Sequence, residues 1–353
     1  MDTLLTPTRR RLLGGIGSLG ALALIGYSLR PAPQSGQNGV RFGGETMGTR
    51  YSVTIAGAPL SKARLEAAQA DVHAALDGVD RRMSLYRADS ELTGFNAHPA
   101  TPIQLSEDLF AVLVVAQTVA RLSGGAFDVS VAPLVRAWGF GPERPSALPS
   151  PQEIETRRAL IGYRGLRLDP ANRTAIKAHG GLQADLGGVA KGYGVDLAAR
   201  ALEALGIGDY MIEAGGEVRA SGLNREARPW RIGIEEPDVM PRRARLVVPL
   251  SGAAMATSGD YRNYFERGGK RYSHEIDPVT ASPITHELAS VTVVTKDCAQ
   301  ADALSTALMV LGPQKGWMLA DRASLAAHFI IRDPGGTLRD RATPAFLALS
   351  ARA

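Results

Sequence analysis

Two kinds of hydrophobic pattern are mixed along this chain, and their order is the feature that most constrains its fold. Apolar residues at helical spacing predict helices at about 61–82, from Ser106 onward, at 188–205 and at 301–311. Short apolar runs predict strands at 51–55, 211–213, 230–234, 246–248 and 291–294, and near 326–339. These elements do not follow a strict βαβ period, so we expect an α+β fold rather than a doubly wound sheet.

The first thirty residues have the composition of an export segment. Arg9, Arg10 and Arg11 precede a run rich in Gly, Ala and Leu at 12–29. A basic start followed by an apolar stretch is typical of a signal peptide, and the paired arginines before Leu12 resemble a twin-arginine signal. An uncleaved membrane anchor is the alternative, since the apolar run is barely long enough to span a bilayer. We therefore expect an exported protein, periplasmic or held at the periplasm-facing inner membrane.

Outside this segment the chain has the nearly equal numbers of basic and acidic residues of an ordinary globular protein. We expect a polar linker at 31–41 and a folded domain at 42–345. Residues 1–30 hold four of the 40 basic and one of the 35 acidic residues, which leaves 36 against 34, or a formal charge of +2. That balance gives no charge argument for nucleic-acid binding. Cys298 is the single cysteine, so an internal disulfide is excluded and the core must hold the fold.

The predicted helix at 301–311 carries the most informative polar pair. Asp302 and Thr306 are four residues apart, so they lie on one face of the helix, one turn above the other. A carboxylate and a hydroxyl placed in this way can supply two oxygen ligands to Mg²⁺. A buried aspartate satisfied by a neighbouring threonine is the alternative, and for the pair taken alone it is the commoner arrangement.

Two glycine-rich segments are candidates for close approach to a ligand. At 43–49, glycines precede the first strand and Met47 offers a soft apolar surface, although a turn before a strand is the simpler interpretation. At 184–194, the pattern is a strand, a Gly-Gly turn and a helix. The N-terminus of such a helix, with Lys191 in its first turn, suits a phosphate group, although the spacing is not that of a P-loop.

Three further segments carry candidate polar side chains. Tyr86 could stack on an aromatic ligand and Ser84 could hydrogen-bond it, although a capped loop between helices is equally consistent. Asp128 stands in an apolar setting, so it must be paired, either in the core or in a site. His274 follows a predicted hairpin and is expected beside Asp277, where it could shuttle a proton or act as a polar contact.

Together these segments resemble the ApbE family of FAD:protein FMN transferases. The resemblance covers about residues 41–340. The matching strings, in the family's order, are E-T-M-G-T, M-S-x-Y-R-x-x-S-E-L-x-x-F-N, G-x-F-D, D-L-G-G-x-A-K-G-Y-x-V-D, A-G-G-E, A-T-S-G-D-Y, H-x-I-D-P and A-D-A-L-x-T-A. Two departures are minor: Val129 and Ser130 stand where the family often has Pro-Thr, and Ala281 replaces a usual glycine, which could shift a turn.

The resemblance implies mixed sheets packed with helices in two intimately associated lobes, with FAD held in a cleft between them. Such enzymes split the pyrophosphate of FAD, pass FMN to a Ser or Thr hydroxyl of a target protein and release AMP. The resemblance further implies that Asp302, Thr306 and the main-chain carbonyl of Ala184 bind Mg²⁺, which gives Asp302 a catalytic role. His274 would activate or place the acceptor hydroxyl.

The resemblance also implies which residues contact the substrate FAD. They are Met47, Ser84, Leu85 and Tyr86 along the flavin or adenine, Asp128 and Gly187 elsewhere on FAD, Lys191 near the phosphates, and Ser273 and His274 at the hairpin. The expected acceptor is an exported flavoprotein, such as a subunit of a respiratory electron-transfer complex, and no nucleic acid is expected as a partner. A Mg²⁺-dependent FAD pyrophosphatase giving FMN and AMP, and a non-catalytic FAD-binding protein, stay open as alternatives.

Overall fold

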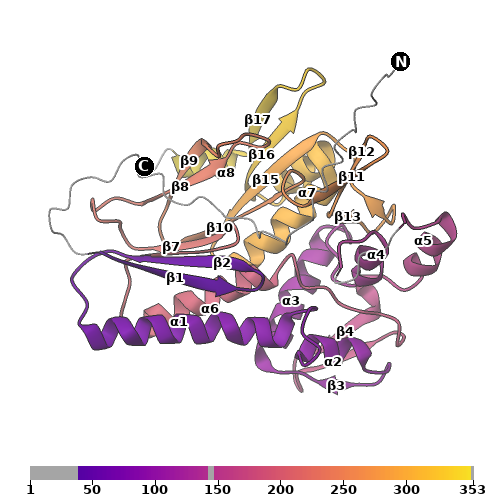
Figure 1. Ribbon diagram of the computed structural model, residues 1–353, viewed down its shortest axis with the longest axis horizontal. Helices are drawn as coiled ribbons and strands as arrows, with labels where there is room; N and C mark the ends of the chain where they lie inside the picture. The colour runs from indigo at the N-terminus through magenta and orange to yellow at the C-terminus, as the bar shows by residue number, and fades with distance from the viewer. Residues whose placement is uncertain (1–38, 142–146, 351–353) are drawn as a thin grey trace, which may run out of the picture.

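An eight-stranded sheet forms the centre of the molecule (Figure 1). The computed structural model describes residues 39–141 and 147–350. Every neighbouring pair in the sheet is antiparallel, and pairs such as Val53 with Ile212 join distant parts of the chain. In spatial order the strands are β1 (Val40–Thr46), β2 (Thr49–Ile55), β6 (Tyr210–Ala214), β7 (Glu217–Ser221), β10 (Ala253–Gly259), β15 (Leu288–Thr295), β16 (Ala326–Arg332) and β17 (Leu338–Ala342).

Three long helices pack on one face of this sheet. They are α1 (Lys62–Met83), α6 (Ala190–Ala204) and α7 (Cys298–Arg322). Val72 and Leu76 of α1, Val195 of α6, and Val53 and Ile212 of the sheet belong to one buried cluster. The helical spacing of Val72 and Leu76 turns both side chains toward the same face, which is why the apolar stripe of α1 is buried.

The opposite face of the sheet is covered by a hairpin and a short C-terminal helix. The hairpin consists of β8 (Trp230–Glu235) and β9 (Ala244–Leu250), and the helix is α8 (Pro344–Ser350). Met211, the neighbour of Ile212, packs here with Trp230 and Phe346, because successive side chains of a strand point to opposite faces. The sheet is therefore buried on both sides.

A second, more helical part adjoins one end of the sheet (Figure 1). Its helices are α2 (Glu91–Ala97), α3 (Glu107–Leu122), α4 (Ala132–Ala137), α5 (Pro151–Arg158) and the 3₁₀ turn η1 (Tyr163–Gly165). Its small sheet has the order β3 (Ile103–Gln104), β5 (Thr174–Lys177), β4 (Leu166–Asp169). Leu109 and Leu113 of α3 share a buried cluster with Leu304 and Leu308 of α7, so the two parts have a common core.

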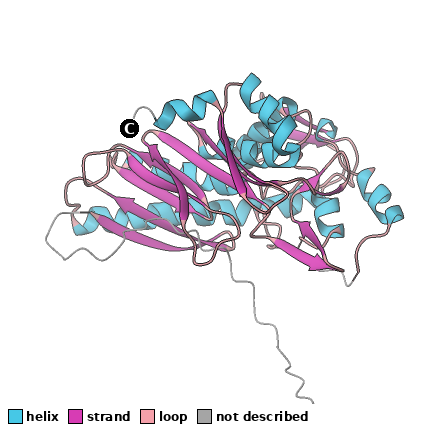
Figure 2. Cartoon of the chain, turned by 90° about the horizontal axis from the view of Figure 1, so that it is seen from above, coloured by secondary structure: helices cyan, strands magenta, loops and turns pink. Residues whose placement is uncertain are grey.

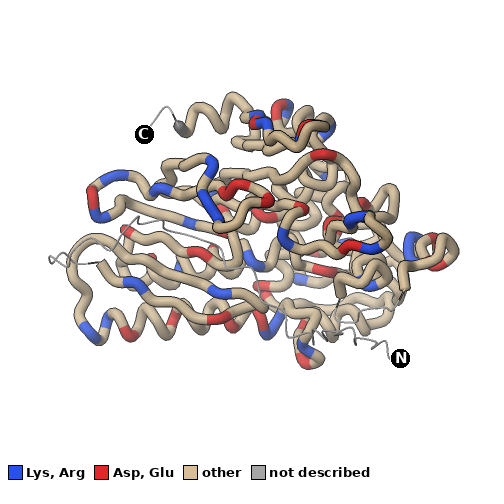
Figure 3. The backbone as a smooth tube through the Cα atoms, turned by 45° about the horizontal axis from the view of Figure 1, so that its top comes forward, with Lys and Arg blue, Asp and Glu red and all other residues tan. Residues whose placement is uncertain are grey.

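Two short hairpins lie between the parts, namely β11 (Tyr264–Arg267) with β12 (Lys270–Ser273) and β13 (Ile276–Asp277) with β14 (Ser282–Pro283). Helices and strands are packed together along the length of the molecule (Figure 2). Lys and Arg are interspersed with Asp and Glu along the described backbone (Figure 3). The predicted α+β class and the packing of two lobes are confirmed by this arrangement.

Several predicted boundaries change. The linker expected at 31–41 is wrong at its end, because Val40 and Arg41 already pair with β2 in the sheet. The helix expected at 301–311 begins earlier, at Cys298, but ends as predicted, because Gly312 has a non-helical φ of 75° and a second helix, which runs to Arg322, follows across this kink. Residues 1–30, expected to be an export signal or anchor, lie outside the described residues. None of the helices described is long and apolar enough to cross a bilayer.

Candidate active site

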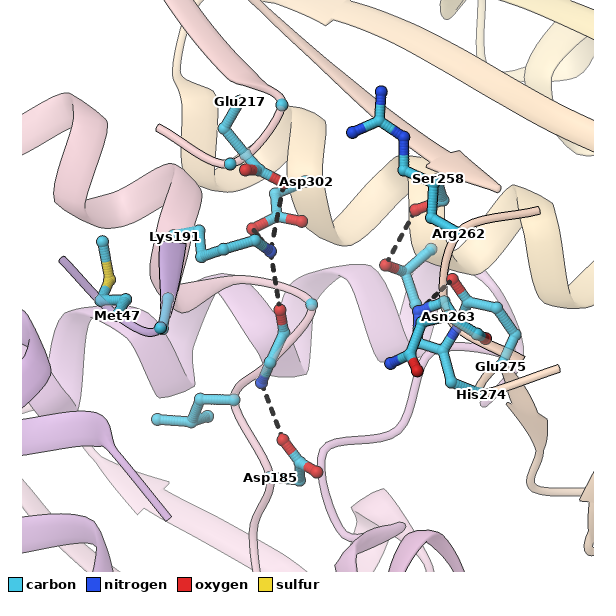
Figure 4. A pocket seen from close by; sticks show the side chains of 18 of the residues that line it. Met47, Asp185, Lys191, Glu217, Ser258, Arg262, Asn263, His274, Glu275 and Asp302 are labelled. Atoms are coloured by element: carbon cyan, nitrogen blue, oxygen red, sulfur yellow. Dashed lines mark hydrogen bonds and ion pairs between the residues drawn. The ribbon is translucent and has the colours of Figure 1, made fainter. Parts of the chain in front are cut away.

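A cavity of about 720 Å³ lies between the large sheet and the helical part (Figure 4). Its walls come from segments far apart in the sequence, among them 83–87, 126–129, 185–188, 190–191, 257–259, 261–263, 274–276 and α7. A volume of this size is in the range of small-molecule and cofactor sites. The cleft expected between two lobes is thus present, and most of the predicted site residues line it.

Asp302 and Thr306 both line the cavity from α7, as their spacing predicts. Asp302 is 3% exposed, and its Oδ2 accepts a hydrogen bond from Gly192 N at 3.1 Å. Thr306 Oγ1 lies 3.3 Å from Ser258 Oγ at the end of β10. Burial raises the pKa of Asp302, while the Lys191 ammonium and the Gly192 N–H oppose the shift.

Ala184, whose carbonyl is expected beside this pair, lies outside the cavity lining. Its carbonyl accepts a hydrogen bond from Asn96 Nδ2 at 2.9 Å, its N–H donates to Asn96 Oδ1 at 2.7 Å, and the residue is fully buried. The lining of the cavity begins one residue later, at Asp185. The backbone that approaches the pair is Gly188, where an added methyl group would lie 2.9 Å from Thr306 Oγ1. The absence of a side chain at Gly188 therefore makes room for the threonine hydroxyl.

Lys191 lies between two acidic side chains. Its Nζ is 3.1 Å from Glu217 Oε1 and 3.9 Å from Asp302 Oδ2, and it donates to Gly187 O at 3.1 Å (Figure 4). Glu217 Oε2 is buried and has no hydrogen-bond partner among the described residues. Burial raises the pKa of Glu217 to about 8, against the opposing effect of Lys191. Sequence reasoning assigned no role to Glu217, although the A-G-G-E string contains it.

His274 lies at the opposite side of the cavity, directly after β12. Its N and Nδ1 lie 3.1 and 3.0 Å from Asn263 O. A carbonyl oxygen can only accept, so Nδ1 carries the proton and the lone pair of neutral His274 is on Nε2. The nearby carboxylate is Glu275, whose Oε1 is 3.6 Å from Nε2. The expected partner Asp277 instead accepts from Val279 N at 2.9 Å.

The residues predicted to contact FAD divide into two groups. Those that line the cavity are Met47, Ser84, Leu85, Tyr86, Asp128, Gly187, Lys191 and His274. Ser273 does not line the cavity: it is 4% exposed, and its hydroxyl accepts from Glu275 N at 3.2 Å. Tyr86 is 73% exposed and therefore stands at the rim.

Asp128 has a structural role in addition to its place in the lining. Its Oδ1 accepts from Ser130 N and Oγ at 2.8 and 2.6 Å, and its Oδ2 accepts from Tyr163 N at 2.8 Å. Burial raises the pKa of Asp128, and these hydrogen bonds oppose the shift. Asp128 thus ties the segment before α4 to the 3₁₀ turn η1, a contact for which the sequence gives no signal.

Comparison with known proteins agrees with this arrangement. Residues 47–329 match the ApbE family. The chain belongs to the ApbE family. FAD:protein FMN transferase of Vibrio cholerae is 41% identical over 321 residues, covering 90% of this chain and 94% of the relative. FAD:protein FMN transferase of Haemophilus influenzae is 43% identical over 303 residues, covering 84% and 88%.

Solved ApbE structures have the same fold. The flavin transferase ApbE from Vibrio cholerae superposes with a TM-score of 0.81 at 39% identity, covering 88% of this chain and 99% of the other. The apo form of Pseudomonas stutzeri flavinyl transferase ApbE gives a TM-score of 0.79 at 41% identity, covering 88% and 96%. The family assignment made from the motifs is therefore confirmed.

The departure at Ala281 is accommodated in this ApbE chain. Ala281 has a φ of 54°, the left-handed conformation that favours glycine. Its side chain is fully buried in a cluster with Trp138, and its carbonyl accepts from Trp138 Nε1 at 2.9 Å. The turn thus keeps a positive φ despite the alanine, and contacts to Trp138 hold it in place.

Proposed function

We propose that this chain transfers FMN from FAD to a Ser or Thr hydroxyl of an acceptor protein and releases AMP. One observation carries the proposal: the Asp302–Thr306 pair and His274 line the same cavity from different elements. A transfer between two substrates requires a group that handles the phosphates and another that handles the attacking hydroxyl. The names of the relatives support the same reaction.

The residues at the α7 side of the cavity fit a Mg²⁺ ion. Glu217 and Asp302 place two carboxylates around a single ammonium, and Glu217 Oε2 lacks a partner among the described residues. Asp302 and Thr306 would hold the ion beside the backbone at Gly188, since magnesium prefers oxygen ligands. When bound, it would neutralise charge on the pyrophosphate. Within the described ranges no three His, Cys, Asp or Glu side chains form a metal group, consistent with a site of one carboxylate, one hydroxyl and main-chain or water oxygens.

The proposed step exchanges one phosphorus–oxygen bond for another. The acceptor hydroxyl oxygen bonds to the phosphorus of the FMN half, and the bond from that phosphorus to the bridging oxygen breaks. AMP leaves with the electron pair, and the hydroxyl proton passes to His274 Nε2, whose lone pair is available because Nδ1 donates to Asn263 O. Lys191 in the first turn of α6 would face the phosphates, where its positive charge and the positive end of the helix dipole are favourable.

The decisive experiment combines the chain from residue 31 with FAD, Mg²⁺ and an acceptor domain that bears an exposed threonine. Intact mass spectrometry of the acceptor is read together with release of AMP and FMN. We expect the acceptor to gain one FMN, with one AMP released, and no gain in EDTA. His274→Ala should suppress the transfer while FAD binding remains. Release of free FMN and AMP beside an unmodified acceptor would instead establish the pyrophosphatase, and uncut FAD would leave binding alone.

We also propose that the protein acts outside the cytoplasm, on an exported acceptor such as a respiratory electron-transfer subunit. The support is the run of Arg9, Arg10 and Arg11 before an apolar stretch. Replacing Arg10 and Arg11 with lysine should keep the protein in the cytoplasm, as measured by cell fractionation. Unchanged export would contradict the twin-arginine assignment, and the mass of the exported protein would distinguish a cleaved signal from a retained membrane anchor.

A further inference from the structure

Two arginines and two aspartates from four segments meet beside the cavity. Arg332 ends β16, Asp260 directly follows β10, Asp238 lies between β8 and β9, and Arg271 lies in β12. We call these four residues the Arg332 cluster. Its two positive and two negative side chains balance, so the cluster is a structural joint rather than a binding site for an ion.

Arg332 holds both aspartates at once. Its Nη1 and Nη2 donate to the two carboxylate oxygens of Asp260, each at 2.8 Å. Its Nη2 and Nε donate to Asp238 Oδ2 at 2.7 and 3.0 Å. A guanidinium paired with a carboxylate through two parallel hydrogen bonds fixes direction as well as distance. Arg332 N donates to Glu287 O at 2.8 Å, so a main-chain hydrogen bond fixes Arg332 to the segment that leads into β15 of the large sheet.

Arg271 connects the cluster to the hairpin that precedes His274. Its Nη2 donates to the main-chain oxygen of Asp260 at 3.0 Å, and its guanidinium lies 3.6 Å from the ring centre of Tyr264 on β11. β11 and β12 form a separate two-stranded sheet. Such a hairpin has little stability of its own, so contacts with the rest of the protein must fix its position.

Asp260 also stands between the two sides of the cavity. Two residues before it, Ser258 Oγ contacts Thr306 Oγ1 at 3.3 Å. Three residues after it, the carbonyl of Asn263 lies 3.0 Å from His274 Nδ1. The segment between Ser258 and Asn263 therefore sets the distance between the phosphate side of the cavity and the side of the acceptor hydroxyl. Arg332 binds this segment near its middle.

We propose that Arg332 is a positioning residue for His274, acting through Asp260 and Arg271. This inference rests on the proposed role of His274 as the group that takes the acceptor proton. Without the guanidinium, Asp260 and Asp238 lose the donor they share, and the 260–274 segment is held to the sheet and to β8 only by its other contacts, such as Asp260 N with Ala289 O at 3.2 Å and the Arg262–Glu235 ion pair. Stacking of Tyr272 on Phe265 and Trp138 still holds the hairpin to the helical part, so we expect a shift rather than unfolding.

The test is the rate of FMN transfer by Arg332→Ala and Arg332→Lys. A displacement of the order of 1 Å in a reacting group costs about 100-fold in rate, which is the loss expected for Arg332→Ala at saturating acceptor. The KM for FAD should be unchanged, because Arg332 is outside the cavity lining. Lysine supplies the positive charge without the paired N–H donors, so the transfer rate of Arg332→Lys should be lower by about 10-fold. Methylguanidinium added to Arg332→Ala should restore part of the rate.

Arg245→Ala is the matched control. Arg245 binds Asp340 with Nε and Nη2 at 2.8 and 2.6 Å, and its side chain is 20% exposed compared with 23% for Arg332. This pair joins β9 to β17, away from His274. We expect a similar loss of Tm in Arg245→Ala but an unchanged transfer rate. Equal losses of rate in the two variants, or a loss that appears only in KM for FAD, would overturn the proposal.

A double variant separates this inference from the proposed function. If His274→Ala alone leaves transfer unchanged, the assigned role of His274 is wrong. Suppose instead that His274→Ala lowers the transfer rate, and that Arg332→Ala then lowers it by the same factor in that variant as in the unmodified protein. In that case His274 keeps its role but the positioning inference fails. The proposal expects little further loss in the double variant, because Arg332 acts through a side chain that is already gone.

Discussion

Lys191, which is 27% exposed, pairs with the buried Glu217 at the wall of the cavity, with Nζ 3.1 Å from Oε1, and Asp302 lies 3.9 Å from the same ammonium. Each carboxylate is at most 5% exposed. One ammonium thus faces two carboxyl groups in a poorly solvated place, where charge without a partner is costly and where burial raises the pKa of both acids. This imbalance makes the site responsive to a second cation.

Lys191→Met should expose that imbalance. Two buried carboxylates then lack a counter-charge, so we expect the free energy of unfolding in EDTA to fall by about 3–5 kcal/mol. A Mg²⁺ ion bound at Asp302 would replace part of the missing charge. The rise in Tm on adding Mg²⁺ should therefore be larger for Lys191→Met than for the unmodified protein, as thermal unfolding with and without Mg²⁺ will measure.

Lys177→Met is the control for this experiment. Lys177 is also buried, but its Nζ donates to the carbonyls of Phe95 and Asn96, each at 3.0 Å, rather than to carboxylates. We expect Lys177→Met to destabilise the protein without changing its response to Mg²⁺. The same enlarged response in both variants would show that Mg²⁺ acts elsewhere.

Asp302→Asn should abolish the dependence on Mg²⁺. The amide preserves the size of the side chain but removes the charge, so we expect transfer to fall by at least about 100-fold, as for loss of a major electrostatic contribution. The transfer rate of Thr306→Val should fall less, by about 10-fold, since the substitution removes a neutral oxygen ligand rather than a charged one. Titration of Mg²⁺ by calorimetry should show weakened binding in both.

Ser305→Ala supplies the comparison on the same helix. Ser305 is fully buried, outside the cavity lining, and its hydroxyl donates to Asp302 O at 2.9 Å. Its loss should leave Mg²⁺ affinity unchanged. Normal Mg²⁺ binding by Asp302→Asn would refute the assignment of Asp302 as a ligand.

Gly188→Ala tests whether the backbone at Gly188 adjoins the proposed Mg²⁺ ligands Asp302 and Thr306. The new methyl group would lie 2.9 Å from Thr306 Oγ1 and 3.2 Å from Phe127 Cε2, so the threonine must move. We expect weaker Mg²⁺ binding and a transfer rate lower by about 10-fold. Gly180→Ala, which introduces a methyl group into open space, should behave like the unmodified protein. Unchanged Mg²⁺ affinity in Gly188→Ala would mean that Gly188 does not adjoin the ion.

Glu213 should make stability depend on pH. Burial raises the pKa of Glu213 to about 7, although hydrogen bonding from Gly216 N opposes the shift. Between about pH 4.5 and 7 the folded state therefore binds more protons than the unfolded state, and the free energy of unfolding falls as pH rises. The contribution is at most about 3 kcal/mol.

Urea unfolding at pH 5 and pH 8 checks this prediction. Glu213→Gln should lose less stability between these two pH values than the unmodified protein does. Glu226→Gln replaces an exposed side chain and should keep the original dependence. An equal pH dependence in the unmodified protein and Glu213→Gln would show that Glu213 titrates normally.

Local sequence determined the helices and strands, because the directions of their side chains repeat at a fixed spacing along the chain. The spacing of Asp302 and Thr306 places both on one face of a helix, and the apolar stripe of α1 places Val72 and Leu76 on its buried side, because helical periodicity depends on the backbone alone. The motifs that identify the family are also local strings, and the comparisons confirm them. The mixture of helical and strand patterns was sufficient to predict the α+β class.

Tertiary structure decided which groups from different segments meet. Sequence reasoning chose Ala184 as a ligand, but Asn96, 88 residues away, occupies its carbonyl, and the neighbouring Gly188 adjoins Thr306 instead. It placed His274 beside Asp277, but the ring is bound to the carbonyl of Asn263. These contacts depend on how the hairpin and α7 pack on the large sheet. No pattern within a single segment contains that information, because it arises from long-range burial and charge pairing.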